Sequence, residues 1–180
     1  MNPLDPLFAW RRRDTGAVKL YGAIVAQARL PVFYQEFGVP DTLEGRFVVL
    51  SLHLFAVLHR LKAEGALAFD LAQELIDRFS EDMETVLREL GVSDLKIPKK
   101  VRELAASSAA LLEGYEEAFA EGDDAIAAAI ANALPLDDGA EKAVSGRLAH
   151  YLRGIVRQLQ TEPLAAVRAG ELSFPEIASG

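Results

Sequence analysis

Residues 20–61 read LYGAIVAQARLPVFYQEFGVPDTLEGRFVVLSLHLFAVLHRL. This stretch predicts a first helix that ends near Pro31, because proline disfavours helix in the residue before it. A short aromatic turn with Phe33 and Tyr34 follows and is expected to be half-buried. A second helix, over about 42–64, is then apolar on nearly every side, which predicts a helix at the centre of a core.

The rest of the chain also has the 3.6-residue periodicity of helices, and period-two alternation never lasts long. Apolar stripes and chain-breaking residues predict further helices over about 67–90, 98–120, 123–134 and 140–160. The first firm helix is expected to follow Asp14 and Thr15, with one face formed by Val18, Tyr21, Val25 and Ala28. The expected stripe of 67–90 is Leu71, Leu75, Phe79, Met83, Val86, Leu87 and Leu90, and that of 140–160 is Leu148, Tyr151, Leu152, Ile155 and Leu159. We therefore expect an all-α fold, a single antiparallel bundle of about six or seven helices. Its expected divisions are a loose or short helical N-terminal arm over 1–16, a helical domain over 17–160 and a C-terminal tail over 161–180, docked through Phe174.

Composition narrows the class of protein. The 180 residues are enough for one domain with a real core, and 51% of them are hydrophobic. The net charge of −8 argues against nucleic acid as a partner. The chain has no cysteine, which removes disulfides, thiolate zinc sites and thiol nucleophiles. The N-terminus has no secretory signal pattern, and the longest apolar run, 47–58, falls short of the roughly 20 residues that span a bilayer.

Three histidines were the first candidates for metal binding or catalysis. His53 and His59 lie six residues apart, about 120° around one helix, so they cannot hold one ion as an i, i+4 pair could. His150 is remote from both in sequence. No serine lies in a nucleophile elbow and no glycine-rich phosphate loop is present. We therefore expect no catalytic residues, no metal and no cofactor.

A polar stripe runs along the central helix. Arg46, His53 and Arg60 are spaced by seven residues, which places them nearly in line. Buried charges need partners, and the pattern favours a structural ion-pair network, with a partner-binding groove as the alternative. Candidate partners are Asp41, Asp77, Glu81 and Asp82.

Two basic features stand out against the acidic background. Arg11, Arg12 and Arg13 follow Trp10 and its apolar neighbours, an arrangement suited to an anionic membrane surface. A second cluster contains Lys96, Lys99, Lys100 and Arg102. Charge that merely confers solubility is the commoner explanation for both, and a membrane-surface role is the alternative hypothesis.

Several short motifs in order resemble the ubiquinol–cytochrome c chaperone family. The resemblance covers about residues 18–121, and the combination is specific although each piece is weak. It departs from the family at 108–111, where an aromatic–aromatic–Gly–Arg stretch would be expected. The matching pieces are Leu20–Arg29, Pro31, Phe33–Tyr34, Pro40–Thr42, Gly45–Phe47, His53, Arg60–Leu61, Asp82–Met83, Leu87–Val92, Asp94–Leu95 and Pro98–Lys100.

This resemblance implies a non-enzymatic assembly factor for respiratory complex III. It implies binding to newly made cytochrome b, or to a small partner protein, from a cytoplasmic position or peripherally on the inner face of the inner membrane. The physical basis would be a groove between residues 17–37 and the central helix. A lipid- or quinone-binding helical domain is the alternative function. The expected partner-binding residues are Tyr21, Gln27, Arg29, Phe33, Tyr34, Arg46, Phe47, His53 and Arg60.

Overall fold

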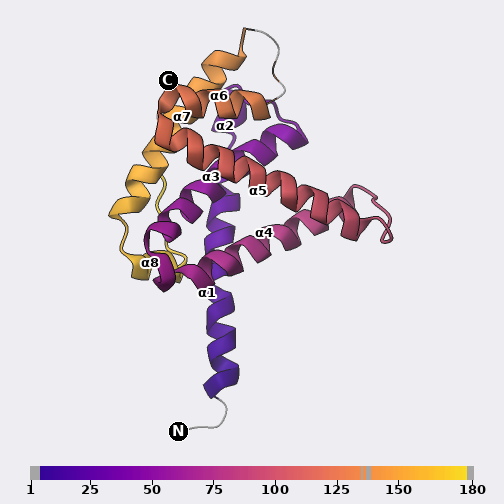
Figure 1. Cartoon of the computed structure of the whole chain (residues 1–180), viewed down its shortest axis with the longest axis vertical. Coiled ribbons are helices and arrows are strands. Elements are labelled where there is room, and N and C mark those ends of the chain that lie inside the picture. Colours follow the sequence, from indigo (N-terminus) through magenta and orange to yellow (C-terminus); the bar gives the residue numbers. More distant parts are fainter. Residues whose placement is uncertain (1–4, 135, 137–138, 178–180) are drawn as a thin grey trace. The chain divides into compact units, whose positions relative to one another are not determined.

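A computed structural model describes the backbone of residues 5–134, 136 and 139–177, with side chains from residue 16 onward. These residues are almost entirely helical and contain no strand, which confirms the all-α prediction (Figure 1). The helices are α1 (Asp5–Ala28), α2 (Val32–Gln35), α3 (Leu43–Ala63), the 3-10 turn η1 (Gly65–Leu67), α4 (Phe69–Glu89), α5 (Ile97–Glu121), α6 (Asp123–Ala133), α7 (Glu141–Thr161) and α8 (Leu164–Ala169).

The predicted bounds of the five long helices after α2 differ from the observed ones by no more than two residues. The first helix is different, because α1 begins at Asp5 rather than after Thr15. Residues 5–16, which we expected to be a loose or short helical arm, continue that helix. Pro6 falls in its first turn, where proline is tolerated because the missing N–H would have no helical partner.

Contacts divide the chain into two compact units, and α1, α3 and α5 each supply residues to both. This division follows different boundaries from the predicted arm, domain and tail. Unit 1 comprises Met1–Ala23, Leu61–Ser107 and Glu162–Leu172, and unit 2 comprises Ile24–Arg60, Ser108–Thr161 and Ser173–Gly180.

In unit 1, α4 buries one stripe of side chains at intervals of four residues, as predicted. The stripe consists of Leu71, Leu75, Phe79 and Met83. Val86 and Leu87, which were predicted for the same stripe, are half-buried. Leu90, also predicted for it, is 60% exposed because the helix has ended before it. The Tyr21 hydroxyl on α1 donates a hydrogen bond of 2.8 Å to the Asp82 carboxylate on α4.

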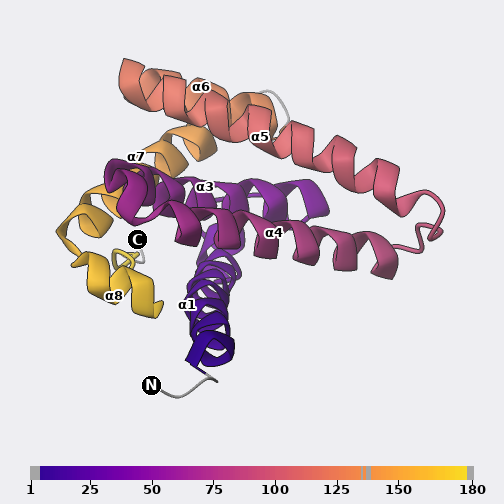
Figure 2. The same ribbon diagram turned by 60° about the horizontal axis from the view of Figure 1, so that its bottom comes forward.

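Helix α8 lies beside α1 in the same unit (Figure 2). A Cβ atom at Gly16 would overlap with the backbone carbonyl of Arg168, and one at Gly170 would overlap with Lys19. Glycine at these two positions therefore permits a close approach of backbone to backbone that any larger residue would prevent.

The buried face of α1 differs from the one we predicted. The sequence pattern grouped Val18, Tyr21, Val25 and Ala28 on one face. The buried residues are instead Ala17, Leu20, Ile24 and Ala28, and Val18 is 45% exposed. Because this part of α1 is apolar around most of its circumference, periodicity alone does not select the face that packs.

In unit 2, α7 packs against α6 and also pairs with α3 through side-chain hydrogen bonds. The face of α7 that we predicted is fully buried and consists of Leu148, Tyr151, Leu152, Ile155 and Leu159. Tyr151 and the Leu159 carbonyl bond to the central helix α3, whose stretch from Val48 to Val57 is largely buried. Among residues 5–134, 136 and 139–177, no helix combines the length and the apolar composition that crossing a bilayer requires.

Candidate binding pocket

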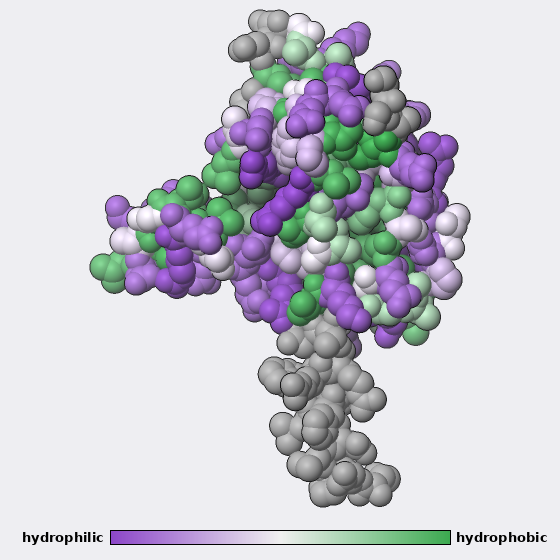
Figure 3. Space-filling view, turned by 180° about the vertical axis from the view of Figure 1, so that it is seen from behind, coloured by the Kyte–Doolittle hydropathy of each residue, from purple (hydrophilic) through white to green (hydrophobic). Residues whose placement is uncertain are grey.

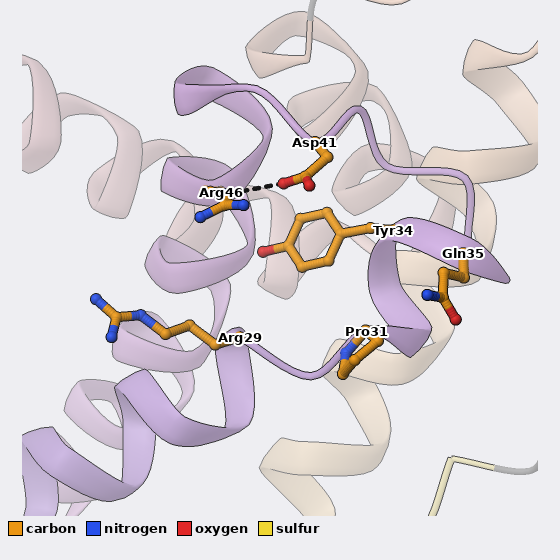
Figure 4. A pocket seen from close by; sticks show the side chains of 6 residues that line it. All are labelled: Arg29, Pro31, Tyr34, Gln35, Asp41 and Arg46. Carbon is orange, nitrogen blue, oxygen red and sulfur yellow. Dashed lines mark hydrogen bonds and ion pairs between the residues drawn. The ribbon is translucent and has the colours of Figure 1, made fainter.

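A pocket of about 620 Å³ opens in unit 2 where the end of α1, the short helix α2 and the start of α3 meet (Figure 4). It combines two guanidinium groups, one carboxylate, one amide and a partly apolar wall. Its lining residues are Arg29, Pro31, Tyr34, Gln35, Asp41 and Arg46.

The loop between α2 and α3 is folded back onto the first turn of α3. Gly38 has a φ of +80°, a conformation that favours glycine. The Thr42 hydroxyl accepts a hydrogen bond of 3.2 Å from the Gly45 backbone N–H and so caps α3. Gly45 also lies directly against the Pro40 carbonyl, where a Cβ atom would overlap with it. This packing brings Asp41 within reach of α3.

Asp41 and Arg46 form an ion pair across the pocket wall, with Nε to Oδ1 at 2.6 Å. The hydrogen bond from Arg46 lowers the pKa of the Asp41 carboxyl below its ordinary value. The same bond raises the pKa of Arg46. Both side chains remain more than half exposed, at 58% and 59%, so the pair contributes little to stability and much to the shape of the pocket.

Tyr34 connects the pocket to the end of α1. Its hydroxyl donates a hydrogen bond of 2.9 Å to the Ala28 carbonyl, one of the last carbonyls of that helix. Burial raises the pKa of Tyr34, although the nearby Arg46 and Arg29 oppose that shift. The Arg46 guanidinium lies 5.9 Å from the centre of the Tyr34 ring. Figure 4 shows Arg29 extending on the side to which the Tyr34 hydroxyl points.

Behind the pocket, His53 lies fully buried in a chain of hydrogen bonds. Its Nδ1 is 2.7 Å from the Val49 carbonyl, which can only accept, so Nδ1 carries the proton. Its Nε2 is 3.1 Å from the Tyr151 hydroxyl and accepts from it. The Tyr151 oxygen in turn accepts from the Gln27 amide at 3.0 Å. Burial lowers the pKa of His53 to about 4, so the neutral ring is the form present at pH 7.

Aromatic rings enclose this chain of hydrogen bonds. Phe33 lies with its ring centre 5.5 Å from that of His53 and 5.2 Å from that of Tyr151. Phe174, from the C-terminal segment, lies 5.4 Å from His53. The prediction that the C-terminal segment docks through Phe174 is therefore confirmed.

The structure brings together three of the predicted partner-binding residues, Arg29, Tyr34 and Arg46, in the pocket wall. Phe33 and His53 have no exposed surface and do not line the pocket. Gln27 belongs to the same buried chain of hydrogen bonds through Tyr151. Their role in binding a partner stays a prediction.

The other predicted residues are not among those that line the pocket. Tyr21 belongs to unit 1. Phe47 is half-buried on α3, next to a lining residue. Arg60 donates to the Leu159 carbonyl at 2.9 Å. Of the carboxylates proposed as partners of the Arg46, His53 and Arg60 stripe, Asp41 pairs with Arg46. His53 instead bonds to Val49 and Tyr151.

Sequence reasoning did not identify Pro31 and Gln35 as pocket lining. The sequence marks Pro31 as a helix breaker and as part of the family motifs but not as a binding residue, and nothing around Gln35 distinguishes it from a surface glutamine. Tyr151 was placed correctly on the buried face of its helix, but its bond to His53 joins residues 98 positions apart. No local pattern could have revealed that pairing.

The remaining histidines have separate surroundings. His59 Nδ1 lies 3.1 Å from a Glu116 carboxylate oxygen, and His150 is exposed. Within the part of the chain that the structure describes, no group of three or more histidine and acidic side chains is arranged to hold a metal ion.

The turn between α4 and α5 in unit 1 exposes apolar side chains. Figure 3 shows hydrophobic residues at the end of this hairpin, where Leu90 is 60% and Leu95 is 96% exposed. Basic residues adjoin them: Lys99 and Lys100 pair with Glu103 at 3.8 and 2.9 Å. The basic cluster predicted from the sequence therefore lies beside exposed leucines, partly neutralised by acidic neighbours.

The fold and the pocket define a class of protein: an all-α protein that presents a small, partly cationic surface pocket backed by a rigid aromatic core. Comparison with known proteins makes the assignment specific. The chain belongs to the ubiquinol–cytochrome c chaperone family, whose family model matches residues 35–174. This confirms the resemblance over residues 35–121 and extends it to residue 174, whereas residues 18–34 lie outside the match.

The solved structure of the Cbp3 homolog from Brucella abortus is similar over nearly the whole chain. It shares 34% identity with a TM-score of 0.83, and the alignment covers 95% of this chain and 96% of that one. Among curated proteins, ubiquinol-cytochrome-c reductase complex assembly factor 1 of Xenopus laevis is 26% identical over 114 residues, and the human protein of that name is 25% identical. The matched segments cover 63% of this chain but only 57% and 38% of those relatives.

Proposed function

We propose that this protein is an assembly factor for respiratory complex III that binds newly made cytochrome b, with a small partner protein as a second ligand. The observation that carries the proposal is the similarity to the Cbp3 homolog, which extends over 95% of the chain. The relatives named as assembly factors of ubiquinol-cytochrome c reductase support the same complex as the target.

The chemistry of the pocket favours binding over catalysis. The lowered pKa of Asp41 keeps its carboxylate ionised near neutral pH, and the raised pKa of Tyr34 keeps its hydroxyl protonated. General acid–base catalysis needs groups that titrate near the working pH. The arginines and the amide of Gln35 offer hydrogen bonds and charge, which are sufficient to hold a polypeptide.

Deleting the gene in the organism that encodes the chain tests this proposal. We expect mature cytochrome b and assembled complex III to fall while the cytochrome b transcript persists, and a plasmid-borne copy to restore both. Complex III at wild-type levels in the deletion strain would refute the proposed function. In-cell crosslinking with mass spectrometry would identify cytochrome b and the small partner directly.

Contact with the membrane surface is a further part of the proposal. The side chains of Trp10 and Arg11–Arg13 lie outside the described residues, so their role rests on the sequence pattern. The α4–α5 turn adds exposed Leu95 with Lys96 beside it. We expect weak, salt-sensitive co-sedimentation with vesicles containing phosphatidylglycerol, reduced by deleting residues 1–13 and by Leu95→Asp. Binding that neither change affects would contradict a role for these two segments.

A lipid- or quinone-binding function receives no support from the described part of unit 2. That function needs an apolar cavity between the first and central helices. Phe33, His53 and Tyr151 fill this space with ring contacts between 5.2 and 5.5 Å. A stoichiometric lipid or quinone in native mass spectra of the purified protein would reverse this conclusion.

A further inference from the structure

The pocket lining is positively charged, whereas unit 2 as a whole is acidic. Unit 2 contains seven lysines and arginines against thirteen aspartates and glutamates, a net charge of −6. The pocket lining reverses this balance with two arginines and one aspartate. An anion that approaches this unit is therefore repelled over most of its surface and attracted at the pocket.

Most cations of unit 2 already have partners. Arg46 pairs with Asp41, Arg153 pairs with Asp123 at 2.6 Å, and Arg147 donates to the Glu36 carbonyl at 2.9 Å. Within the described part of the unit, Arg29 and Lys142 alone have neither an ion pair nor a side-chain hydrogen bond. Of these two, only Arg29 lines the pocket.

The backbone around Arg29 is held in place. Arg29 directly follows α1, and its backbone N–H donates to the Val25 carbonyl at 3.1 Å. The Tyr34 hydroxyl bonds to the preceding residue, Ala28, at 2.9 Å. Pro31 restricts the chain two residues later. The pocket thus presents an unpaired cation on a backbone that is fixed on both sides.

We propose that this pocket binds the carboxylate of an aspartate or glutamate side chain of the protein's polypeptide partner, with Arg29 as its principal ligand. This inference rests on the proposed function and adds the chemistry of recognition to it. Guanidinium and carboxylate groups match as two parallel hydrogen bonds. Gln35 supplies an amide for the neighbouring peptide backbone, and the Tyr34 ring with Pro31 supplies an apolar wall for the side-chain stem.

Charge favours a carboxylate over a lipid phosphate. Asp41 already neutralises Arg46, so the pocket lining keeps a net charge of about +1 from Arg29. A single carboxylate balances this charge. A bilayer of anionic lipids would have to approach the whole of unit 2, whose net charge of −6 opposes it. An extended peptide can instead reach the pocket without bringing a charged surface close.

A titration of the full-length protein with short peptides tests the chemistry. The probes are acetyl-Ala-Glu-Ala-amide and its glutamine counterpart, followed through the arginine Nε–H signals in NMR spectra. We expect saturable shifts at Arg29 and Arg46 with the glutamate peptide, and binding about tenfold weaker with the glutamine peptide. Arg29→Glu and Arg29→Gln should abolish this difference, whereas Lys142→Glu, the matched change at the other unpaired cation, should keep it.

Several results would overturn the inference. Equal binding of the two peptides, or binding unaffected by Arg29→Glu in a protein with unchanged thermal stability, excludes a carboxylate site. A response to inorganic phosphate without one to the glutamate peptide, or Arg29-dependent binding to phosphatidylglycerol vesicles, assigns the pocket to a phosphate instead.

A complementation assay separates this inference from the proposed function. In the deletion strain, Arg29→Glu should restore less cytochrome b than the wild-type chain or Lys142→Glu. A deletion without effect on complex III refutes the proposed function, and the peptide titration still decides the chemistry of the pocket. Full restoration by Arg29→Glu, together with equal peptide binding, refutes the carboxylate site alone.

Discussion

Protonation of His53 should destabilise the protein at mildly acidic pH. The ring has no exposed surface, and its neighbours are the Val49 carbonyl, the Tyr151 hydroxyl and the rings of Phe33 and Phe174. None of these groups is an acid that could stabilise an imidazolium. Burial therefore lowers the pKa of His53 from 6.5 to about 4.

The sign and size of the effect follow from linkage. Between pH 6.5 and 4 the unfolded chain binds a proton at His53 that the folded protein does not, so stability is fully present above pH 6.5 and falls as the pH drops through this window. Over the whole window the loss amounts to about 3 kcal/mol, at roughly 1.4 kcal/mol per pH unit. At pH 5 about 2 kcal/mol should already be lost.

Urea unfolding at pH 7.5 and pH 5 measures this loss. The comparison is between the wild-type chain and His53→Asn, whose amide can still donate to the Val49 carbonyl but does not titrate. We expect the free energy of unfolding to fall by about 2 kcal/mol more in the wild type than in the variant. Carboxylates and the other histidines titrate in both proteins, so their contribution cancels. Equal losses, or a His53 signal that titrates near pH 6.5 in NMR spectra, would refute the reasoning.

Three substitutions test the packing of the same unit. Gly45→Ala should destabilise the protein by about 1–3 kcal/mol in chemical denaturation, because the new Cβ atom would overlap with the Pro40 carbonyl. The control Gly146→Ala, at a glycine with open space around it, should be neutral or stabilising. Equal effects of the two substitutions would contradict the close approach at Gly45. Tyr115→Phe should preserve or increase the melting temperature, since the buried Tyr115 hydroxyl has no hydrogen-bond partner among the described residues. A clear fall in the melting temperature would indicate that a buried water bonds to this hydroxyl. Arg153→Lys should lower the free energy of unfolding in urea by about 1 kcal/mol. An ammonium cannot stack on the Phe119 ring and also donate to the Phe119 carbonyl and the Asp123 carboxylate. An unchanged unfolding midpoint would show that these contacts of Arg153 are not stabilising.

The helices could be predicted because their limits are local. Pro31, Gly91 and Gly122 end or restart helices through backbone chemistry that needs no tertiary contact. The buried faces of α4 and α7 were also predictable, since each has one apolar stripe. The face of α1 was not, because small and apolar residues surround it and only packing against other elements selects one side.

The pocket was predictable only in part. Arg29, Tyr34 and Arg46 were identified as partner-binding residues from the motifs that resemble the family, and the structure places them around one cavity. The sequence gives no sign that Asp41 would neutralise Arg46 and leave Arg29 unpaired. That outcome depends on the loop that Gly45 allows to fold back, which is a property of three-dimensional packing.

Three hydrogen bonds in unit 2 join residues that are far apart in the sequence, which affects how the protein folds during translation. They join Gln27 to Tyr151, His53 to Tyr151 and Arg60 to Leu159, at sequence separations of 124, 98 and 99 residues. Helical proteins usually fold quickly because their contacts are local. Here the apolar helix α3 emerges from the ribosome long before α7 exists to cover it. During synthesis this member of a chaperone family is therefore itself a nascent chain with an exposed hydrophobic helix, and slow translation beyond α3 should make it prone to aggregation.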